Sequence, residues 1–254
     1  MAFMPFIAAG DPDLATTGRL LRELSIAGAD LIEVGFPYSD PIADGPVIQA
    51  SYTRALAKHV KLREIFATVA SVSRELPTPL VGMVSYAIIF RHGVNEFVKE
   101  ARKAGFAGLI VPDLPGDEAS GFAALMAENL LDLIQLVAPT TPPDRAAKIL
   151  KQATGFVYCI AVAGTTGVRK ELAPQLAEML KSLRIQTKLP LAVGFGISAP
   201  DQIDHLRGIA DGVIVGSAIV KYLETLANEP SKSETVLRQI GEFAKSLADA
   251  AHRV

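Results

Sequence analysis

Short apolar runs alternate with longer amphipathic stretches along this chain. Each run is almost continuously apolar, which is typical of parallel strands that are buried on both faces. Eight runs therefore predict strands, at Met4–Ala9, Leu31–Gly35, Leu80–Val84, Gly108–Val111, Leu133–Val137, Phe156–Ile160, Leu191–Val193 and Val213–Val215.

The stretches between these runs have the periodicity of helices. Leu14, Thr17, Leu21, Leu24 and Gly28 follow one helical face. The longest gap lies between the second and third predicted strands and contains two helical stretches, at Val47–Lys58 and Leu62–Arg74. The pattern thus predicts a helix after each strand and an extra helix after strand 2.

Alternating strands and helices imply parallel pairing through right-handed crossovers. Eight such units in 254 residues favour an α/β fold, a single (β/α)8 TIM barrel in which residues 1–254 form one domain. The alternative is a doubly wound open sheet, which normally has a glycine-rich turn after its first strand. The segment Gly10-Asp11-Pro12 is not such a turn.

The composition excludes several classes of protein. Half of the residues are hydrophobic and the mean hydropathy is +0.31, which excludes a disordered chain. Lys and Arg number 25 against 27 Asp and Glu, so there is no basic excess for binding nucleic acid or an anionic membrane. We expect no membrane span and no signal peptide. The single cysteine, Cys159, fits a reducing compartment, and we expect a cytoplasmic protein.

Two acids lie where a barrel would carry its chemistry. Glu33 is inside the second predicted strand, where a carboxylate is costly unless it is paired or neutralised. It is either one half of a structural ion pair or a functional acid. Asp44 lies in the proline-rich loop Phe36–Pro46 that follows, either as a turn residue before Gly45 or as the second member of an acid/base pair.

Glycine-rich segments follow three adjacent predicted strands. They are Gly164–Gly167 after the sixth strand, Gly194–Gly196 after the seventh and Gly216–Ala218 after the eighth. Turns in such folds use glycine in any case. Glycines also let backbone N–H groups approach a ligand, and a helix N-terminus favours an anion, so together the three segments predict a phosphate site.

The sequence lacks the residues that several other kinds of chemistry need. The four histidines are scattered and have no spacing that suggests zinc, so we expect no metal. None of the predicted strands contains a lysine, which argues against a Schiff-base mechanism and against covalent pyridoxal phosphate in this chain. Cys159 is expected to pack in the core rather than act as a nucleophile.

The run Leu31–Pro46 closely resembles the signature of the tryptophan synthase alpha subunit family. The resemblance covers nearly the whole chain, because Pro5–Pro12, Val111–Pro115, Gly194–Ser198 and Val215–Val220 also match the family's strand ends and loops. It implies a lyase that cleaves indole-3-glycerol phosphate into indole and glyceraldehyde 3-phosphate by retro-aldol chemistry. It further implies a beta-subunit partner, which carries pyridoxal phosphate, in an alpha2-beta2 complex, with no cofactor in this chain.

The resemblance also implies roles for individual residues. Glu33 and Asp44 match the family's catalytic glutamate and aspartate, and Tyr158 matches a tyrosine that contacts the substrate. Residues around the indole or the closing loop are matched by Phe6, Thr166, Phe195 and Ile214. Phosphate contacts are matched by Gly167, Gly196, Gly216 and Ser217.

The chain departs from the family pattern in three places. The family usually has a helix before the first strand, whereas this sequence begins almost at that strand, so either the bottom of the barrel is less covered or the start lies upstream. Ala87 stands where the family usually has Asn, on a third strand that runs from Met83 to Ile88. The sixth loop, Ala161–Gly164, lacks the polar residues common there.

Three alternatives remain at this point. One is a neighbouring phosphate-binding barrel, such as an indole-glycerol-phosphate synthase or an isomerase of the same pathway, but no lysine lies on a strand where a synthase would need it. A second is a non-catalytic partner barrel, although a scaffold has no need of a buried acid at position 33. The third is a stand-alone indole-releasing lyase.

Overall fold

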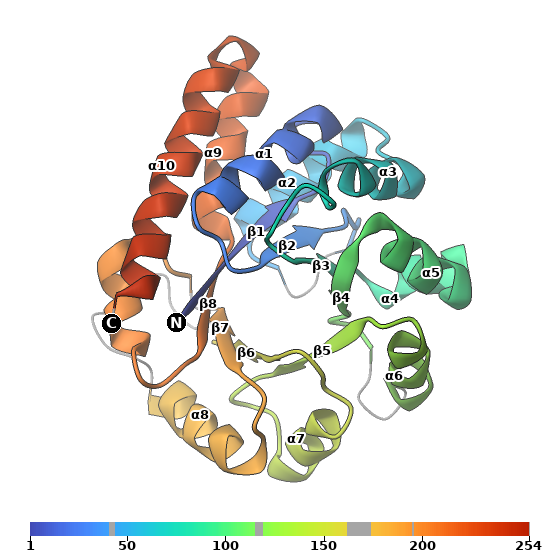
Figure 1. Ribbon diagram of the computed structural model, residues 1–254, viewed down its shortest axis with the longest axis vertical. Helices are drawn as coiled ribbons and strands as arrows, with labels where there is room; N and C mark the ends of the chain where they lie inside the picture. The colour runs from blue at the N-terminus through green and yellow to red at the C-terminus, as the bar shows by residue number, and fades with distance from the viewer. Residues whose placement is uncertain (41–43, 115–118, 162–173, 195, 254) are drawn as a thin grey trace.

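The computed structural model is a closed barrel of eight parallel strands in chain order (Figure 1). The structure describes residues 1–40, 44–114, 119–161, 174–194 and 196–253. Each apolar run became a strand, and the predicted TIM barrel is confirmed. The strands are β1 (Ala2–Ala8), β2 (Ile32–Gly35), β3 (Leu80–Met83), β4 (Phe106–Ile110), β5 (Asp132–Val137), β6 (Val157–Ile160), β7 (Leu191–Gly194) and β8 (Gly212–Val215).

Helices surround the barrel on its outside (Figure 1). They include two helices, α2 and α3, between β2 and β3, which confirms the extra helix after strand 2. The helices are α1 (Leu14–Ile26), α2 (Pro46–Ala57), α3 (Leu62–Val72), α4 (Tyr86–His92), α5 (Val94–Ala104), α6 (Ala119–Glu128), α7 (Pro143–Leu150), α8 (Pro174–Gln186), η1 (Pro200–Leu206), α9 (Ser217–Asn228), η2 (Pro230–Lys232) and α10 (Ser233–His252).

Alternate residues of each strand divide between two apolar layers. One set points outward and packs under the helices in the main core, where four phenylalanines (Phe36, Phe66, Phe97 and Phe106) lie with ring centroids 5.2 to 6.4 Å apart. The other set fills the barrel as a separate cluster of Met4, Val81, Ile110, Ile134, Phe156, Ala192 and Ile214. The interior is thus packed, and reactive groups have room only toward the strand ends.

The third strand is shorter than the sequence suggested. β3 ends at Met83, and Ser85 caps α4, its hydroxyl oxygen accepting a hydrogen bond from the Ala87 N–H at 3.2 Å. The Ser85 hydroxyl also donates to Asp113 at 2.7 Å. The prediction of a strand running to Ile88 was therefore wrong: Ala87 lies in the first turn of a helix, because Ser85 is a strong N-cap residue.

Candidate active site

Glu33 lies on β2, where it is in register with Phe6 of β1 and Val81 of β3. Its side chain is fully buried, and neither carboxyl oxygen has a hydrogen-bond partner among the described residues. No salt bridge between described residues includes it either, so this part of the chain supplies no partner for a structural ion pair. Burial without compensation raises the pKa of Glu33 to about 8.

This pKa decides what Glu33 can do. At neutral pH the side chain is mostly protonated, so it can deliver a proton as a general acid. The carboxylate that results is a base of the same pKa, so it can accept a proton back. One buried group can therefore serve both halves of an acid–base cycle.

Asp44 lies directly before Gly45, the N-cap residue of α2. Its backbone carbonyl accepts a hydrogen bond from the Gln49 side-chain amide at 2.7 Å. The carboxyl group is half-buried, and burial raises its pKa. No hydrogen bond between described residues reaches this carboxyl group, so it is not engaged as a turn residue of the kind the sequence allowed.

Burial and the charges of the two acids raise the pKa of two tyrosines. Burial raises the pKa of Tyr158 on β6 well above its usual value, and the charges of Glu33 and Asp44 raise it further. Burial and the same two charges also raise the pKa of Tyr52 on α2. Glu33, Asp44 and both phenols thus belong to one group, in which each phenol keeps its proton.

Glycines make room for the two phenols at the strand ends. A Cβ atom on Gly194 of β7 would lie 2.9 Å from the Tyr158 hydroxyl oxygen. A Cβ atom on Gly35 of β2 would lie 2.5 Å from the Tyr52 hydroxyl oxygen. Sequence reasoning predicted Tyr158 but missed Tyr52, whose only signal was its place on one helical face with Ile48.

Phe6 and Ile214 have different surroundings. Phe6 lies in a small apolar cluster with Ala8, Ile48, Tyr52 and Val220, and its ring meets that of Tyr52 edge-on at 6.5 Å. Ile214 of β8 lies in the barrel-filling cluster, as does Val81 beside Glu33. Phe6 therefore belongs to the wall around the acids, whereas Ile214 belongs to the packed interior.

The predicted phosphate residues that the structure describes lie after neighbouring strands. Gly196 follows β7, has a φ of +62° and is exposed, with no atom within 4 Å of a Cβ placed there. Gly216 follows β8 as the N-cap of α9, and Ser217 is the first, exposed residue of that helix. The first N–H groups of a helix lack partners within it and attract anions. Thr166, Gly167 and Phe195 lie outside the described residues.

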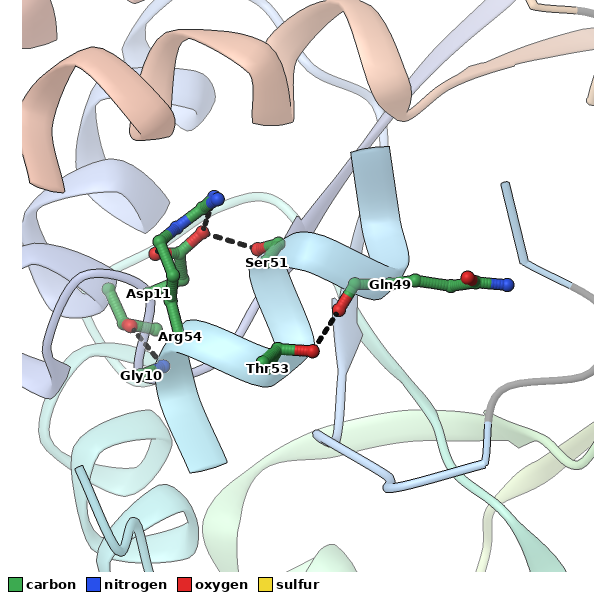
Figure 2. A network of polar contacts seen from close by, with 7 residues as sticks. Gly10, Asp11, Gln49, Ser51, Thr53 and Arg54 are labelled. Carbon is green, nitrogen blue, oxygen red and sulfur yellow. Dashed lines mark hydrogen bonds and ion pairs between the residues drawn. The ribbon is translucent and has the colours of Figure 1, made fainter. Parts of the chain in front are cut away.

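A polar network holds α2 against the loop after β1 (Figure 2). Arg54 of α2 donates to both carboxylate oxygens of Asp11, at 2.9 Å from Nε and 2.6 Å from Nη2. The Ser51 hydroxyl donates to the same carboxylate. Asp11 is fully buried. The network therefore sets the position of α2, which follows Asp44 and carries Tyr52, and sequence reasoning did not find it.

The described residues contain no group of three or more His, Cys, Asp and Glu side chains that could hold a metal ion. None of the helices in the described ranges is long and apolar enough to cross a membrane. What the barrel does hold is a buried acid with a pKa near neutrality, a second carboxyl group and two phenols at its carboxyl end. The fold and the site define a (β/α)8-barrel enzyme of the acid–base class.

Comparison with known proteins names the family within that class. A family model described as tryptophan synthase alpha chain matches residues 1–252. The chain belongs to the tryptophan synthase alpha chain family, and it is a lyase of tryptophan biosynthesis.

Individual relatives are similar to this chain over most of its length. The tryptophan synthase alpha chain of Microcystis aeruginosa is 46% identical over 250 residues, which covers 98% of this chain and 93% of the relative. That of Synechocystis sp. is 50% identical over 223 residues, covering 87% and 84%. The solved tryptophan synthase A-subunit of Pyrococcus furiosus has a TM-score of 0.87 at 36% identity, covering 98% of each chain.

Proposed function

We propose that this chain cleaves indole-3-glycerol phosphate into indole and glyceraldehyde 3-phosphate, with Glu33 as the proton-transfer residue. The observation that carries the assignment is Glu33 itself, a fully buried acid that has no hydrogen-bond partner among the described residues and a pKa of about 8. Buried acids with a purely structural role are paired. A buried acid without a partner therefore indicates a function that outweighs the free-energy cost of its burial.

The reaction requires two proton movements. The Glu33 carboxylic acid protonates C3 of the indole ring, which forms a cationic indolenine. The bond between C3 and the glycerol chain then breaks, and its electron pair returns to the ring. As this bond breaks, the adjacent hydroxyl loses its proton to the Glu33 carboxylate and becomes the carbonyl of glyceraldehyde 3-phosphate. Glu33 ends protonated again, so the cycle is balanced.

The other residues receive supporting roles in this proposal. Asp44, as a carboxylate, faces the indole N–H and stabilises the positive charge that forms on the ring, an effect larger in the transition state than in the substrate. The substrate lies against Phe6, Tyr158, Thr166 and Phe195, above the packed barrel interior to which Ile214 belongs. The phosphate group is held by the backbone N–H groups of Gly167, Gly196, Gly216 and Ser217, together with the Ser217 hydroxyl.

We further propose that a tryptophan synthase beta subunit is the partner, in an alpha2-beta2 complex in the cytoplasm. The solved tryptophan synthase a2b2 complex of Pyrococcus furiosus, described as mutually activated, includes a chain 37% identical to this one with a TM-score of 0.88. Pyridoxal phosphate then belongs to the beta subunit. The acid–base cycle of Glu33 needs no cofactor in this chain.

The test is indole release from indole-3-glycerol phosphate, measured with and without added beta subunit. We expect slow release by the chain alone and faster release with the partner. Equal rates in the two assays would identify a stand-alone lyase. No release in either assay would overturn the proposed activity. Competition by glycerol 3-phosphate, but not by glycerol, tests the phosphate site.

A further inference from the structure

Glu33 keeps its proton at neutral pH only while water stays away from its carboxyl group, so the side chains that cover it matter to the reaction. Its neighbours at the same level of the barrel are Phe6 on β1 and Val81 on β3, the two residues in register with it. Both are apolar and buried. These two sides of Glu33 are therefore apolar.

The strands β1 and β2 provide little cover one step above Glu33, toward the carboxyl end of the barrel. Side chains alternate between the two faces of a strand, so the residue above Glu33 on β2 is Gly35. Gly35 is in register with Ala8 of β1 on one side and with Met83 of β3, which is half-buried, on the other. A glycine and an alanine are too short to cover a glutamate, so on the side of β1 and β2 the cover comes from elsewhere.

Phe6 and Tyr52 fill the space above Gly35. A Cβ atom on Gly35 would lie 2.5 Å from Cζ of the Phe6 ring and 2.5 Å from the Tyr52 hydroxyl oxygen. Atoms that are not bonded do not approach so closely, so the two side chains already occupy the place of a side chain at residue 35. Phe6 begins at the level of Glu33 and its ring reaches the level of Gly35. The ring thus leans over β2 just above Glu33.

The two aromatic side chains are held in this place by their surroundings. Their rings meet edge-on at 6.5 Å, and only 4% of Phe6 and 3% of Tyr52 is exposed. Next to Tyr52 on α2, the Ser51 hydroxyl donates to Asp11 in the loop after β1, the strand that carries Phe6. The polar network therefore joins the helix turn that carries one ring to the end of the strand that carries the other.

We propose that Phe6 and Tyr52 form a shield that keeps water from the Glu33 carboxyl group, and that Gly35 lets this shield close because it has no side chain. Tyr52 is then a positioning residue that acts through Glu33, and its ring rather than its hydroxyl has this role. Phe6 shields Glu33 in addition to contacting the substrate. The inference rests on the role proposed for Glu33 and deepens it, because it assigns the protonation of the acid to two named side chains.

The polar groups that face Glu33 do not stabilise its charge. Among the described residues they are the hydroxyl groups of Tyr52 on α2 and Tyr158 on β6, and the Asp44 carboxyl group before α2. None of them forms a hydrogen bond with Glu33 within this part of the chain. Burial is the cause that raises the pKa of Glu33 to about 8. Access of water to the carboxyl group therefore sets its charge state.

The test is Tyr52→Ala, which removes the ring from α2 and opens this side of Glu33 to water. We expect the pKa of Glu33 to fall by at least about one pH unit, because its charged form regains hydration. The measurement is a 13C NMR titration of labelled Glu carboxyl groups in the full chain, with Glu33→Gln to assign the signal. If Tyr52→Ala does not fold, Tyr52→Val takes its place. Valine fills the base of the same space and leaves its tip open, so the same fall is expected.

The pH dependence of indole release gives an independent readout. Glu33 acts first as an acid, so the rate falls as pH rises through its pKa. In Tyr52→Ala this fall is expected at a lower pH, so that the ratio of kcat/KM at pH 9 to kcat/KM at pH 6 drops about tenfold. A purely structural role of Tyr52 would lower kcat/KM by the same factor at both pH values.

Two control variants separate the ring from the hydroxyl and from the general loss of a side chain. Tyr52→Phe keeps the ring, so the pKa of Glu33 is expected to stay at about 8. Tyr222→Ala removes a whole ring from α9, where Tyr222 packs against Phe243 in the main core outside the barrel. It is expected to change neither the pKa of Glu33 nor the pH dependence of the rate.

Two results would overturn the inference. An unchanged Glu33 pKa in the folded Tyr52→Ala or Tyr52→Val chain would show that water is excluded without the ring. A fall in Tyr52→Phe as large as in Tyr52→Ala would show that the hydroxyl controls the acid. If the unaltered chain releases no indole, the proposed function fails, whereas the NMR titration still decides whether the ring shields Glu33.

Discussion

Two fully buried carboxyl groups of this protein differ in whether the described residues supply them with partners. Asp11, in the loop after β1, and Glu33, on β2, are both fully removed from solvent. Asp11 accepts hydrogen bonds from Nε and Nη2 of Arg54 and from the Ser51 hydroxyl (Figure 2). Glu33 accepts none from the described residues.

The difference shows that burial alone does not define a site. A paired carboxylate has its desolvation offset by charge-assisted hydrogen bonds, and it joins two elements of the fold. An unpaired acid reduces the same cost by keeping its proton, and so becomes a proton donor near neutral pH. The hydrogen-bond partners, rather than the depth, separate the structural acid from the chemical one.

The largest expected effect is on the pH dependence of stability. Glu33 has a pKa of about 8 in the folded state against 4.5 as the reference value. Between these values the unfolded chain releases the proton while the folded chain keeps it, so the free energy of unfolding falls as pH rises, by up to about 5 kcal/mol in total. Urea titrations of the unaltered chain and Glu33→Gln from pH 4 to 9 measure the difference between them. A constant difference across that range would contradict the raised pKa.

Removing the partner of Asp11 should be almost as costly. In Arg54→Met the Asp11 carboxylate stays buried with Ser51 as its remaining donor, and we expect the free energy of unfolding to fall by about 3–5 kcal/mol. Urea denaturation at pH 7 is the measurement. The double variant Asp11→Asn/Arg54→Met should recover part of the loss, because no charge is then left unpaired. A loss below about 1 kcal/mol in the single variant would mean that the pair is not needed.

Glu33→Gln should affect activity rather than folding. The amide has the size of the acid but cannot carry the proton, so we expect indole release to fall by at least about a hundredfold. Stability at pH 7 should not fall, in contrast to Arg54→Met. Near-normal turnover by the folded variant would remove Glu33 from the mechanism and leave it as an unexplained buried acid.

The smallest effect is expected at the edge of the polar network. Ser51→Ala removes one of the donors to Asp11 and leaves both arms of Arg54, so we expect a loss of about 1–2 kcal/mol in the free energy of unfolding and a kcat within about twofold. Thr53→Ala is the matched control, since Thr53 is exposed and its hydroxyl donates to the Gln49 carbonyl of its own helix. Equal losses in both variants would show that Asp11 does not depend on Ser51.

The sequence by itself determined the architecture and the principal acid. All eight strands lie within two residues of the apolar runs that predicted them, and Glu33 stood out as a charge inside one of these runs. Such features are local: strand periodicity and a polar residue in an apolar segment are read from neighbours along the chain. The family signature around Glu33 and Asp44 added the chemistry that periodicity does not contain.

Only the tertiary structure decided which acid is paired and which is not. Asp11 and Arg54 are 43 residues apart, and nothing in either segment indicates that the two side chains meet. The Tyr52 hydroxyl has room at the end of β2 only because residue 35 is a glycine, and the N-cap residue Ser85 is held by a hydrogen bond to Asp113, 28 residues away. Hydrogen bonding and desolvation depend on every group that surrounds an atom, and those groups are brought together by chain folding rather than by sequence proximity.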